Sequence, residues 1–248
     1  MAIAATTGTR RSTRTMQNLL WAAFFGILVF YSVMAFQYFF AHMAGQREWW
    51  NILQAWLVSD EFSFGEGSVS VDQRVPYTAN SYFMFVHATM GAVALAAGAT
   101  QFVSEIRNRY PEVHRTLGKI YFFGIWIGMA AGLLYLSSIS IWDVYSGAAF
   151  GISLWALDLL VLATSIRAYV AIRNGEVVTH QAWMAFNYSL VLATPGLRLF
   201  WVVLGLTLPF NQAQINTGVA TYLLPFCLLF GLIWFSAQRL RDHRPATA

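Results

Sequence analysis

Two histidines occupy the same position relative to two separate apolar segments. His114 opens the stretch HRTLGKIYFF, and His180 opens HQAWMAFNYS. Because the iron of a b-type haem accepts a neutral imidazole on each face, two such histidines could supply both axial ligands. Arg115 and Lys119 follow His114 and have the charge that haem propionates require. The pattern therefore predicts a haem b site with His114 and His180 as iron ligands and Arg115 and Lys119 beside the propionates.

Three further ionisable side chains fall inside apolar segments. His87 lies about 10 Å along the second of these segments, and Arg198 lies about 12 Å from the outer end of the fifth. Asp158 lies near the middle of the fourth. Charges at such depths cost a few kcal/mol or more unless they are paired or hydrated. We expect either an Asp158–Arg198 ion pair that locks the fold, or a polar chamber of all three residues that binds an anion, a quinone oxygen or a proton.

Each of these sites has a structural alternative. A histidine at a helix start readily bonds free backbone groups in the headgroup region, which would make His114 and His180 structural. His87 would likewise serve as a hydrogen bond between helices. Met84, His87 and Met90 also present thioether and imidazole groups that suit Cu(I), although methionine more often fills gaps in a core.

Membrane helices must position these residues, because the chain is too apolar for a soluble domain. Of its 248 residues, 58% are hydrophobic and only 10% are charged, whereas soluble domains have about 25% charged residues. A span needs roughly 20 apolar residues. Six windows qualify: 17–40, 81–103, 118–140, 147–171, 181–206 and 218–237. The sequence predicts an all-α integral membrane protein, a single membrane domain over residues 1–248 in the form of a six-helix bundle.

Basic residues mark one side of this predicted bundle. They precede the first span and follow the second, fourth and last, whereas the other connections are mostly acidic. The positive-inside rule then places both termini in the cytoplasm. On the outer side lies a long connection, residues 41–80. Its stretch REWWNILQAWLV predicts a helix in the membrane interface, and FSFGEGSVSV predicts a hairpin.

Small residues, a proline and a cysteine add further expectations. Gly124, Gly128 and Gly132 recur every four residues, which is typical of closely packed membrane helices. The pair Pro195-Gly196 predicts a kink in the fifth span. Cys227 has no partner in the chain, which excludes a disulfide within it.

Several motifs together resemble a known family. They are HATMG (from His87), GATQF, HRTLGKIY and HQAWMAFNYSLVLATPGLRLF, spread over roughly residues 80–200. These landmarks are similar to those of the bacterial membrane proteins called domain of unknown function 2306. The resemblance implies a multi-pass protein of the bacterial cytoplasmic (inner) membrane and assigns no activity. That family usually has a basic residue after the Trp-Met pair, where this chain has Ala185 and Phe186.

A looser resemblance is architectural. The placement of the histidines is similar to that in the six-helix, ascorbate-dependent di-haem cytochromes b. There, histidines of the third and fifth helices hold the cytoplasmic-side haem, which His114 and His180 would match. His87 would match a second-helix ligand of the other haem. The fourth predicted span has no histidine, so that second site is incomplete.

Two classes of function remain open from the sequence. The first is a haem-dependent membrane oxidoreductase that exchanges electrons with a quinone or a redox partner. The second is a non-enzymatic membrane protein with structural histidines: an assembly factor, a small transporter or a subunit of a complex. The chain has no phosphate-binding loop and no nucleophile–base pair, and its basic clusters report topology rather than nucleic-acid binding. Its expected surroundings are the lipid bilayer.

Overall fold

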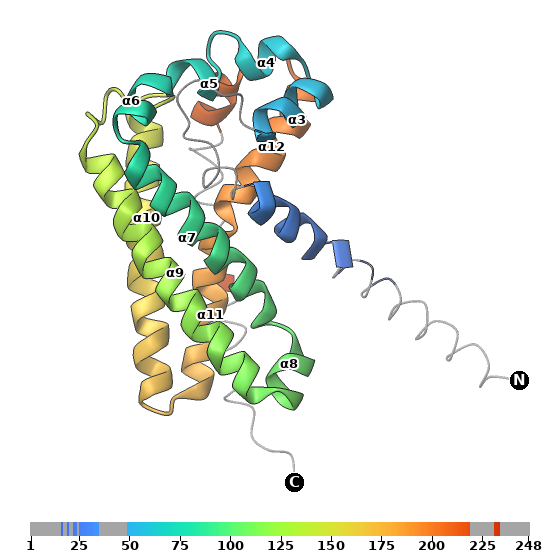
Figure 1. The fold of residues 1–248 in the computed structure, drawn as a ribbon, viewed down its shortest axis with the longest axis vertical. Coiled ribbons are helices and arrows are strands. Elements are labelled where there is room, and N and C mark those ends of the chain that lie inside the picture. Colours follow the sequence, from blue (N-terminus) through green and yellow to red (C-terminus); the bar gives the residue numbers. More distant parts are fainter. Residues whose placement is uncertain are drawn as a thin grey trace, which may run out of the picture.

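The computed structural model describes residues 16, 19, 22–23, 25–34, 49–218 and 231–233, and within them every regular element is a helix. Four helices are long and apolar enough to cross a membrane. They are α7 (Ser81–Thr100), α9 (Pro111–Ser137), α10 (Ala148–Arg173) and the run Val177–Thr207. Figure 1 shows α7, α9, α10 and α11 side by side as a bundle. The predicted all-α fold is thereby confirmed, with four candidate spans, and the count of six stays a prediction. Within window 17–40 the structure describes the shorter apolar helix Phe25–Met34, whereas most of window 218–237, and Cys227, lie outside the described residues.

The third predicted span begins earlier than its apolar window. Helix α9 starts at Pro111 rather than near residue 118, with Glu112 in its first turn. Proline suits the first helical position because its missing N–H has no partner there anyway, and an acidic first turn complements the helix dipole. His114 and Arg115 therefore lie within the helix, in its first turns. A short helix, α8 (Ser104–Arg109), connects α7 to it.

The fifth predicted span is broken into two helices. α11 (Val177–Val191) and α12 (Ala193–Thr207) meet at Leu192. Pro195 explains the break, because a proline cannot donate to the carbonyl four residues earlier and its ring crowds that turn. The predicted kink is present, displaced by one turn toward the N-terminus from Pro195-Gly196. As a result, Arg198 lies on α12 rather than on a straight continuation of α11.

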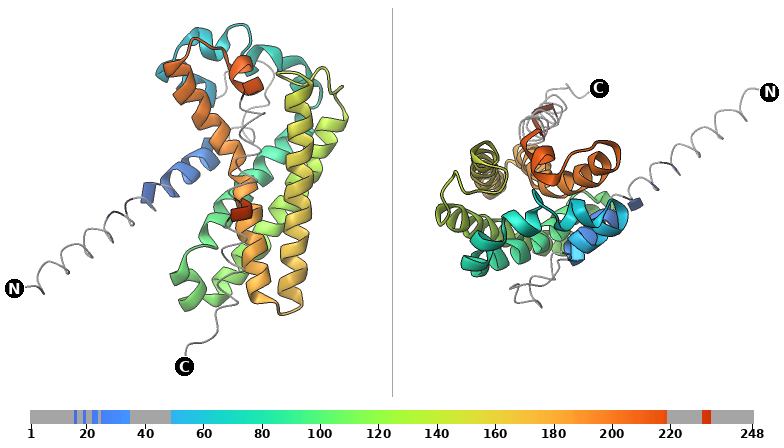
Figure 2. Two further views of the ribbon diagram at one scale, coloured as in Figure 1. Left: turned by 180° about the vertical axis from the view of Figure 1, so that it is seen from behind. Right: turned by 90° about the horizontal axis from the view of Figure 1, so that it is seen from above.

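The outer connection is helical, so the predicted hairpin is wrong. It forms α3 (Trp49–Leu57), α4 (Asp60–Phe64), α5 (Val69–Asp72) and α6 (Arg74–Ala79), gathered at one end of the bundle (Figures 1 and 2). The Ser59 side chain caps α4 by accepting a hydrogen bond from the Phe62 amide at 3.0 Å. Gly67, at φ +79°, turns the chain between α4 and α5. Local capping and the left-handed glycine therefore prevail over the alternating pattern. The predicted interfacial stretch is the helix α3.

The tightest packing joins α7 and α9 through the predicted glycines. A Cβ on Gly124 would stand 2.9 Å from the Met90 carbonyl oxygen, and one on Gly128 would stand 3.3 Å from the Gly91 nitrogen. Neither space admits a side chain without displacing α7. These two glycines act as helix-packing positions, as predicted.

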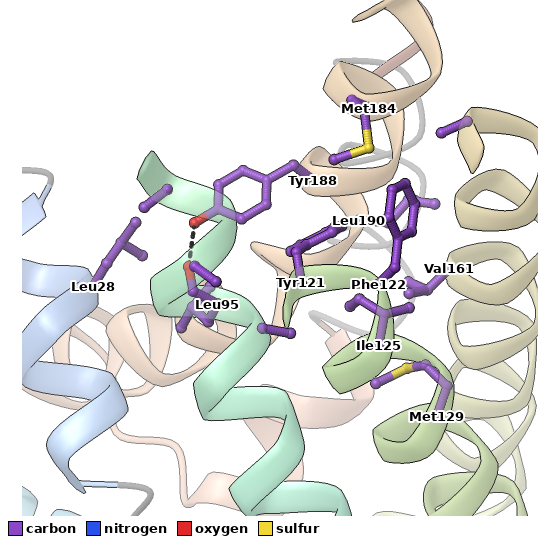
Figure 3. Packing of buried hydrophobic residues seen from close by; sticks show 14 residues of the cluster. Leu28, Leu95, Tyr121, Phe122, Ile125, Met129, Val161, Met184, Tyr188 and Leu190 are labelled. Carbon is purple, nitrogen blue, oxygen red and sulfur yellow. Dashed lines mark hydrogen bonds between the residues drawn. The ribbon is translucent and has the colours of Figure 1, made fainter. Parts of the chain in front are cut away.

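Buried tyrosines also join helices of the bundle through hydrogen bonds (Figure 3). Tyr188 on α11 donates to the Leu95 carbonyl of α7 at 2.9 Å. Tyr121 on α9 donates to the Asn187 side-chain oxygen, and the Asn187 amide group donates to Val161 and Thr164 of α10. All of these polar groups are satisfied where lipid offers no partner. This network fixes the register of four helices.

The two ends of the bundle differ in charge. Arg107, Arg109, Arg115 and Lys119 lie on α8 and the start of α9, opposite the end formed by α3–α6 (Figure 1). That outer connection carries Asp60, Glu61, Glu66 and Asp72. The helices thus separate the charges along one axis. The orientation of that axis in the membrane remains a prediction.

Candidate functional site

A cavity of about 300 Å³ lies between α7, α9, α10 and α12. The structure brings His87, Asp158 and Arg198 to its wall from three different helices. Most of the remaining wall is apolar, with Leu95 and Ile125 among its side chains. The volume is at the lower end of the roughly 300–1,000 Å³ of small-molecule sites.

One pole of the cavity is formed by His87 and Asp158. The Nδ1 atom of His87 lies 2.9 Å from the Gly128 carbonyl oxygen. Because a carbonyl only accepts, Nδ1 carries the hydrogen, and Nε2 of the neutral ring is an acceptor. Asp158 is 7% exposed, and its carboxylate makes no hydrogen bond with any residue that the structure describes.

Gly132 makes room for this pole. A Cβ on Gly132 would stand 2.4 Å from Oδ2 of Asp158 and 2.6 Å from Nδ1 of His87. The carboxylate and the imidazole therefore approach each other through the space that a side chain would fill. At Gly124 and Gly128 the missing side chain lets the backbone of α7 approach. At Gly132 it leaves space for the side chains of Asp158 and His87.

The other pole is built around Trp201. The guanidinium carbon of Arg198 lies 4.2 Å from the centroid of the Trp201 ring, within the range of a cation–π contact. The ring nitrogen of Trp201 donates to Oδ1 of Asn216 at 2.6 Å. Trp201 is 2% exposed. The indole thus holds the guanidinium on its face and the amide at its edge.

Three donors on the cavity wall lack an acceptor among the described residues. They are Nη1 of Arg198, Nδ2 of Asn216 and Nε1 of Trp50. Each is buried, so leaving it unpaired costs about 1–3 kcal/mol, and more for the charged group. Their hydrogen-bonding capacity calls for an oxygen acceptor that no described residue supplies.

The predicted ion pair between Asp158 and Arg198 does not form. Glu105 and Arg109, 2.7 Å apart on α8, make the one ion pair in the described part of the chain. Arg198 instead lies against Trp201, three residues later on the same helix, α12. Asp158, on the straight α10, adjoins His87 instead. The two opposite charges share a cavity without meeting.

The outer connection covers the cavity. The Gly67 carbonyl accepts hydrogen bonds from the Tyr145 hydroxyl and the Ala213 amide, both at 2.9 Å. Gln73 donates to the Tyr135 hydroxyl at 2.8 Å, and both side chains line the cavity. Burial raises the pKa of the Tyr145 phenol above its usual range, against the opposing effect of the nearby Arg198 charge. Tyr145 therefore stays a neutral donor.

The inner histidines lie apart from this cavity, each near the start of its helix. Nδ1 of His180 donates to the Ala168 carbonyl at 2.9 Å, which leaves its Nε2 as an acceptor. Nδ1 of His114 is buried without a partner among the described residues. The ring centroids of Phe122 and His180 lie 6.5 Å apart. Tyr121 is fully buried and packs against Phe122.

The Phe122 ring packs beside His180, one of the two predicted haem ligands. The predicted propionate partners, Arg115 and Lys119, are exposed at the helix start. No group of three or more His, Cys, Asp or Glu side chains suited to a metal occurs in the described ranges.

The alternative copper set is divided between two surfaces. Met84 and His87 line the cavity. The Cβ of Met90 instead lies 3.3 Å from the position of a Cβ on Gly128, in the contact between α7 and α9. Met90 lies six residues after Met84, and at 3.6 residues per turn this places it on a different face of the helix from Met84. The three side chains therefore do not converge on one ion.

Sequence reasoning missed Trp50, Trp201 and Asn216. Trp50 was assigned to the membrane interface with its neighbours, yet it is 8% exposed whereas Trp56 is 81% exposed. Asn216 lies just before the sixth predicted window, where an amide among apolar residues could have indicated a buried polar contact. Their joint role depends on the break in the fifth span, which places Trp201 between Arg198 and Asn216.

Comparison with known proteins gives one match. A family model described as predicted membrane protein, domain of unknown function 2306, matches residues 84–237, more than half of the chain. No curated protein matches the chain. No solved structure matches it.

Proposed function

The chain belongs to the family described as predicted membrane protein, domain of unknown function 2306, and we propose that it binds a small amphipathic molecule in its intramembrane cavity. The head group of this molecule carries oxygen acceptors, and its body is apolar. The observation that carries the proposal is a set of three donors, on Arg198, Asn216 and Trp50, that find no acceptor among the described residues and lie on a mostly apolar wall.

The donors favour an anionic head group. Arg198 has a permanent charge and, in the described part of the chain, no carboxylate beside it. An arginine within the membrane needs a counter-charge, and a guanidinium fork suits an anionic group with two or three oxygens. Asn216 and Trp50 add neutral donors on the same cavity wall, and Oδ1 of Asn216 is already bonded to Trp201. The apolar wall suits a hydrocarbon or aromatic body.

A binding role of this kind favours the non-enzymatic class. A small transporter, or the ligand-binding subunit of a membrane complex, uses such a cavity directly, whereas an assembly factor has no need of unpaired donors at this depth. We propose the orientation from the charge separation: the end with α8 faces the cytoplasm, and α3–α6 cover the cavity on the outer side. The protein then resides in the bacterial inner membrane with both termini in the cytoplasm.

The test compares the affinities of three ligands that share one alkyl chain length and differ in their head group. The purified protein in lipid nanodiscs is titrated with octanesulfonate, octanol and octyltrimethylammonium, with empty nanodiscs as the reference. We expect octanesulfonate to bind tightest. Arg198→Gln removes a charged donor that contributes about 1.5–3 kcal/mol, so it should weaken octanesulfonate binding about 10- to 100-fold. Equal affinity for the three probes would overturn the proposal.

A matched control comes from a second intramembrane arginine. Arg167 on α10 lies over the Trp183 ring at 5.8 Å and does not line the cavity. Arg167→Gln makes the same chemical change without touching the site, and it should leave octanesulfonate affinity unchanged. If both substitutions weaken binding equally, the sulfonate responds to the charge of the bundle rather than to the cavity.

Haem ligation by His114 and His180 is the second candidate. Two observations favour it: the unpartnered Nδ1 of His114 and the free Nε2 of His180. The packing of Phe122 against His180 opposes it. When bound, a haem would supply one-electron chemistry with a quinone or a redox partner. The residues of this chain would contribute the two imidazoles.

The second candidate has its own measurement. Protein made with ample haem supply should purify red, with a low-spin Soret band that sharpens on reduction. His114→Ala and His180→Ala should each abolish the band, because either change removes an axial ligand. His87→Ala should leave it in place. A colourless wild-type protein would remove this candidate and leave the cavity proposal untouched.

A further inference from the structure

We propose that binding of the anionic head group is coupled to the uptake of one proton by Asp158. This inference rests on the proposed function and names its regulation: the cavity takes up an anion and a proton together. The geometry behind it is a cavity with two poles: at Arg198 and, beside His87, at the Asp158 carboxylate, a donor and an acceptor find no hydrogen-bond partner in the described part of the chain.

The empty cavity balances its charges at a distance. Asp158 and Arg198 line the same cavity without touching, so their opposite charges offset each other across it. When an anion binds at Arg198, it replaces Asp158 as the counter-charge of the guanidinium. Asp158 is then left as a second negative charge in a space of about 300 Å³ with mostly apolar walls. Like charges at short range in a low dielectric favour protonation of one of them.

The other ionisable groups on the wall do not provide an alternative near neutral pH. Three are tyrosines, Tyr31, Tyr135 and Tyr145, and a phenol stays protonated below about pH 10. Arg198 stays charged. His87 already uses Nδ1–H as a donor to Gly128. A second proton on its Nε2 would create a cation in this apolar space, whereas a proton on Asp158 removes a charge.

The coupled step conserves charge and atoms. A proton from the water that the cavity reaches binds Oδ of Asp158, and an O–H bond forms. The ligand enters as an anion and keeps its composition. The cavity has one positive and one negative charge before the step, and it has one of each afterwards, because the ligand replaces the carboxylate as the anion. Gly132 permits this step, since the carboxylate needs the space at that glycine to remain beside His87.

The experiment uses octanesulfonate, whose head group stays anionic at every pH used, so any proton taken up must reside on the protein. Binding heats are measured calorimetrically at one pH in two buffers that differ in protonation enthalpy. Their difference gives the number of protons per ligand. We expect about one proton for the wild type and none for Asp158→Asn, which mimics the protonated carboxylate. Glu105→Gln makes the same chemical change at an exposed ion pair and should still take up about one proton.

Affinity follows from the same linkage. Uptake of one proton means that octanesulfonate binds up to about tenfold more tightly for each unit by which the pH is lowered, over the pH range in which the proton is taken up. Asp158→Asn should bind at least as tightly as the wild type at the acid end, with no dependence on pH. This slope is measured on the wild type alone, so the inference can be tested even if Asp158→Asn does not fold.

The outcomes separate the two proposals. Binding that depends on Arg198 but involves no proton uptake, with a flat pH dependence, overturns the coupling and leaves the binding function in place. Proton uptake that persists in Asp158→Asn also overturns it, since the proton then resides elsewhere. If octanesulfonate does not bind the wild type at all, the proposed function fails, and the coupling fails with it.

Discussion

Gly132→Ala tests the geometry of the cavity most directly. The new methyl group would stand 2.4 Å from Oδ2 of Asp158 and 2.6 Å from Nδ1 of His87. Ordinary contacts of a Cβ begin at about 3.4 Å, so both side chains must move. Neither moves freely, because Asp158 is 7% exposed and His87 is bonded to the Gly128 carbonyl.

The expected loss of stability combines three effects. Overpacking of a buried site costs about 1–3 kcal/mol. Loss of the His87–Gly128 hydrogen bond costs about 0.5–1.5 kcal/mol. Alanine is favoured over glycine within a helix by about 1 kcal/mol, which opposes both costs. We therefore expect Gly132→Ala to lower the free energy of unfolding by about 1–3 kcal/mol.

The assay is reversible unfolding in mixed detergent micelles, with Gly196→Ala as the control. Gly196 lies in α12, and a Cβ there would meet nothing among the described residues within 4 Å. This substitution should be neutral or should stabilise the protein by up to about 1 kcal/mol. Gly132→Ala should also weaken octanesulfonate binding because it displaces the pole beside His87. If the two variants unfold alike and bind alike, the close approach of Asp158 and His87 at Gly132 is refuted.

Three further predictions concern the fold. Asp158→Asn and Arg198→Gln should show a modest coupling of about 0.5–1 kcal/mol in a double-mutant cycle, because their charges interact across the cavity without contact; fully additive losses would show that the two charges do not interact. Tyr121→Phe should cost about 1–3 kcal/mol, because the Asn187 side-chain oxygen loses its donor. The control Tyr169→Phe should be neutral, because Tyr169 makes ring contacts with Phe122 and Trp126 and its hydroxyl has no hydrogen bond within the described residues. A reporter fused after Ala248 should read cytoplasmic and one inserted near Gly67 external, and the reverse result would invert the proposed orientation.

The membrane helices were predictable because their signal is local. Apolar composition over about 20 residues is enough to indicate a span, and windows 81–103 and 147–171 agree closely with α7 and α10. The start of α9 was missed because hydropathy detects lipid contact rather than helix formation, and a helix can continue through HRTLGK into the polar region. The packing of Gly124 and Gly128 followed from their spacing alone.

The hairpin failed for a related reason. Alternation of apolar and polar residues over FSFGEGSVSV favours a strand only where a partner strand exists, and the structure satisfies that backbone within short helices instead. The serine cap of α4 and the left-handed Gly67 were visible in the sequence. Each is a local signal, and together they outweigh a weak pattern of period two.

The candidate site was predictable in part. His87, Asp158 and Arg198 were identifiable because each is ionisable at membrane depth, and the structure places all three on one cavity. How they are arranged was not predictable, because it depends on where a proline breaks a helix. A straight fifth span would have left Arg198 close to Asp158 in depth, which is why an ion pair was expected. Arg198 instead contacts Trp201, three residues along the same helix.

The fold keeps the two opposite charges apart, with Arg198 on Trp201 and Asp158 beside His87. If stability alone determined the arrangement, a neutral pair or a direct contact would be less costly than an unpaired arginine and an unpaired carboxylate in one cavity. Trp201 offsets part of the cost through its ring, and Gly132 gives Asp158 a place beside His87. Neither provides the acceptor that Nη1 of Arg198 lacks within the described residues. A cavity that leaves its strongest donor unsatisfied is therefore suited to an anion from outside the chain, and the carboxylate that remains is then the group best placed to receive a proton.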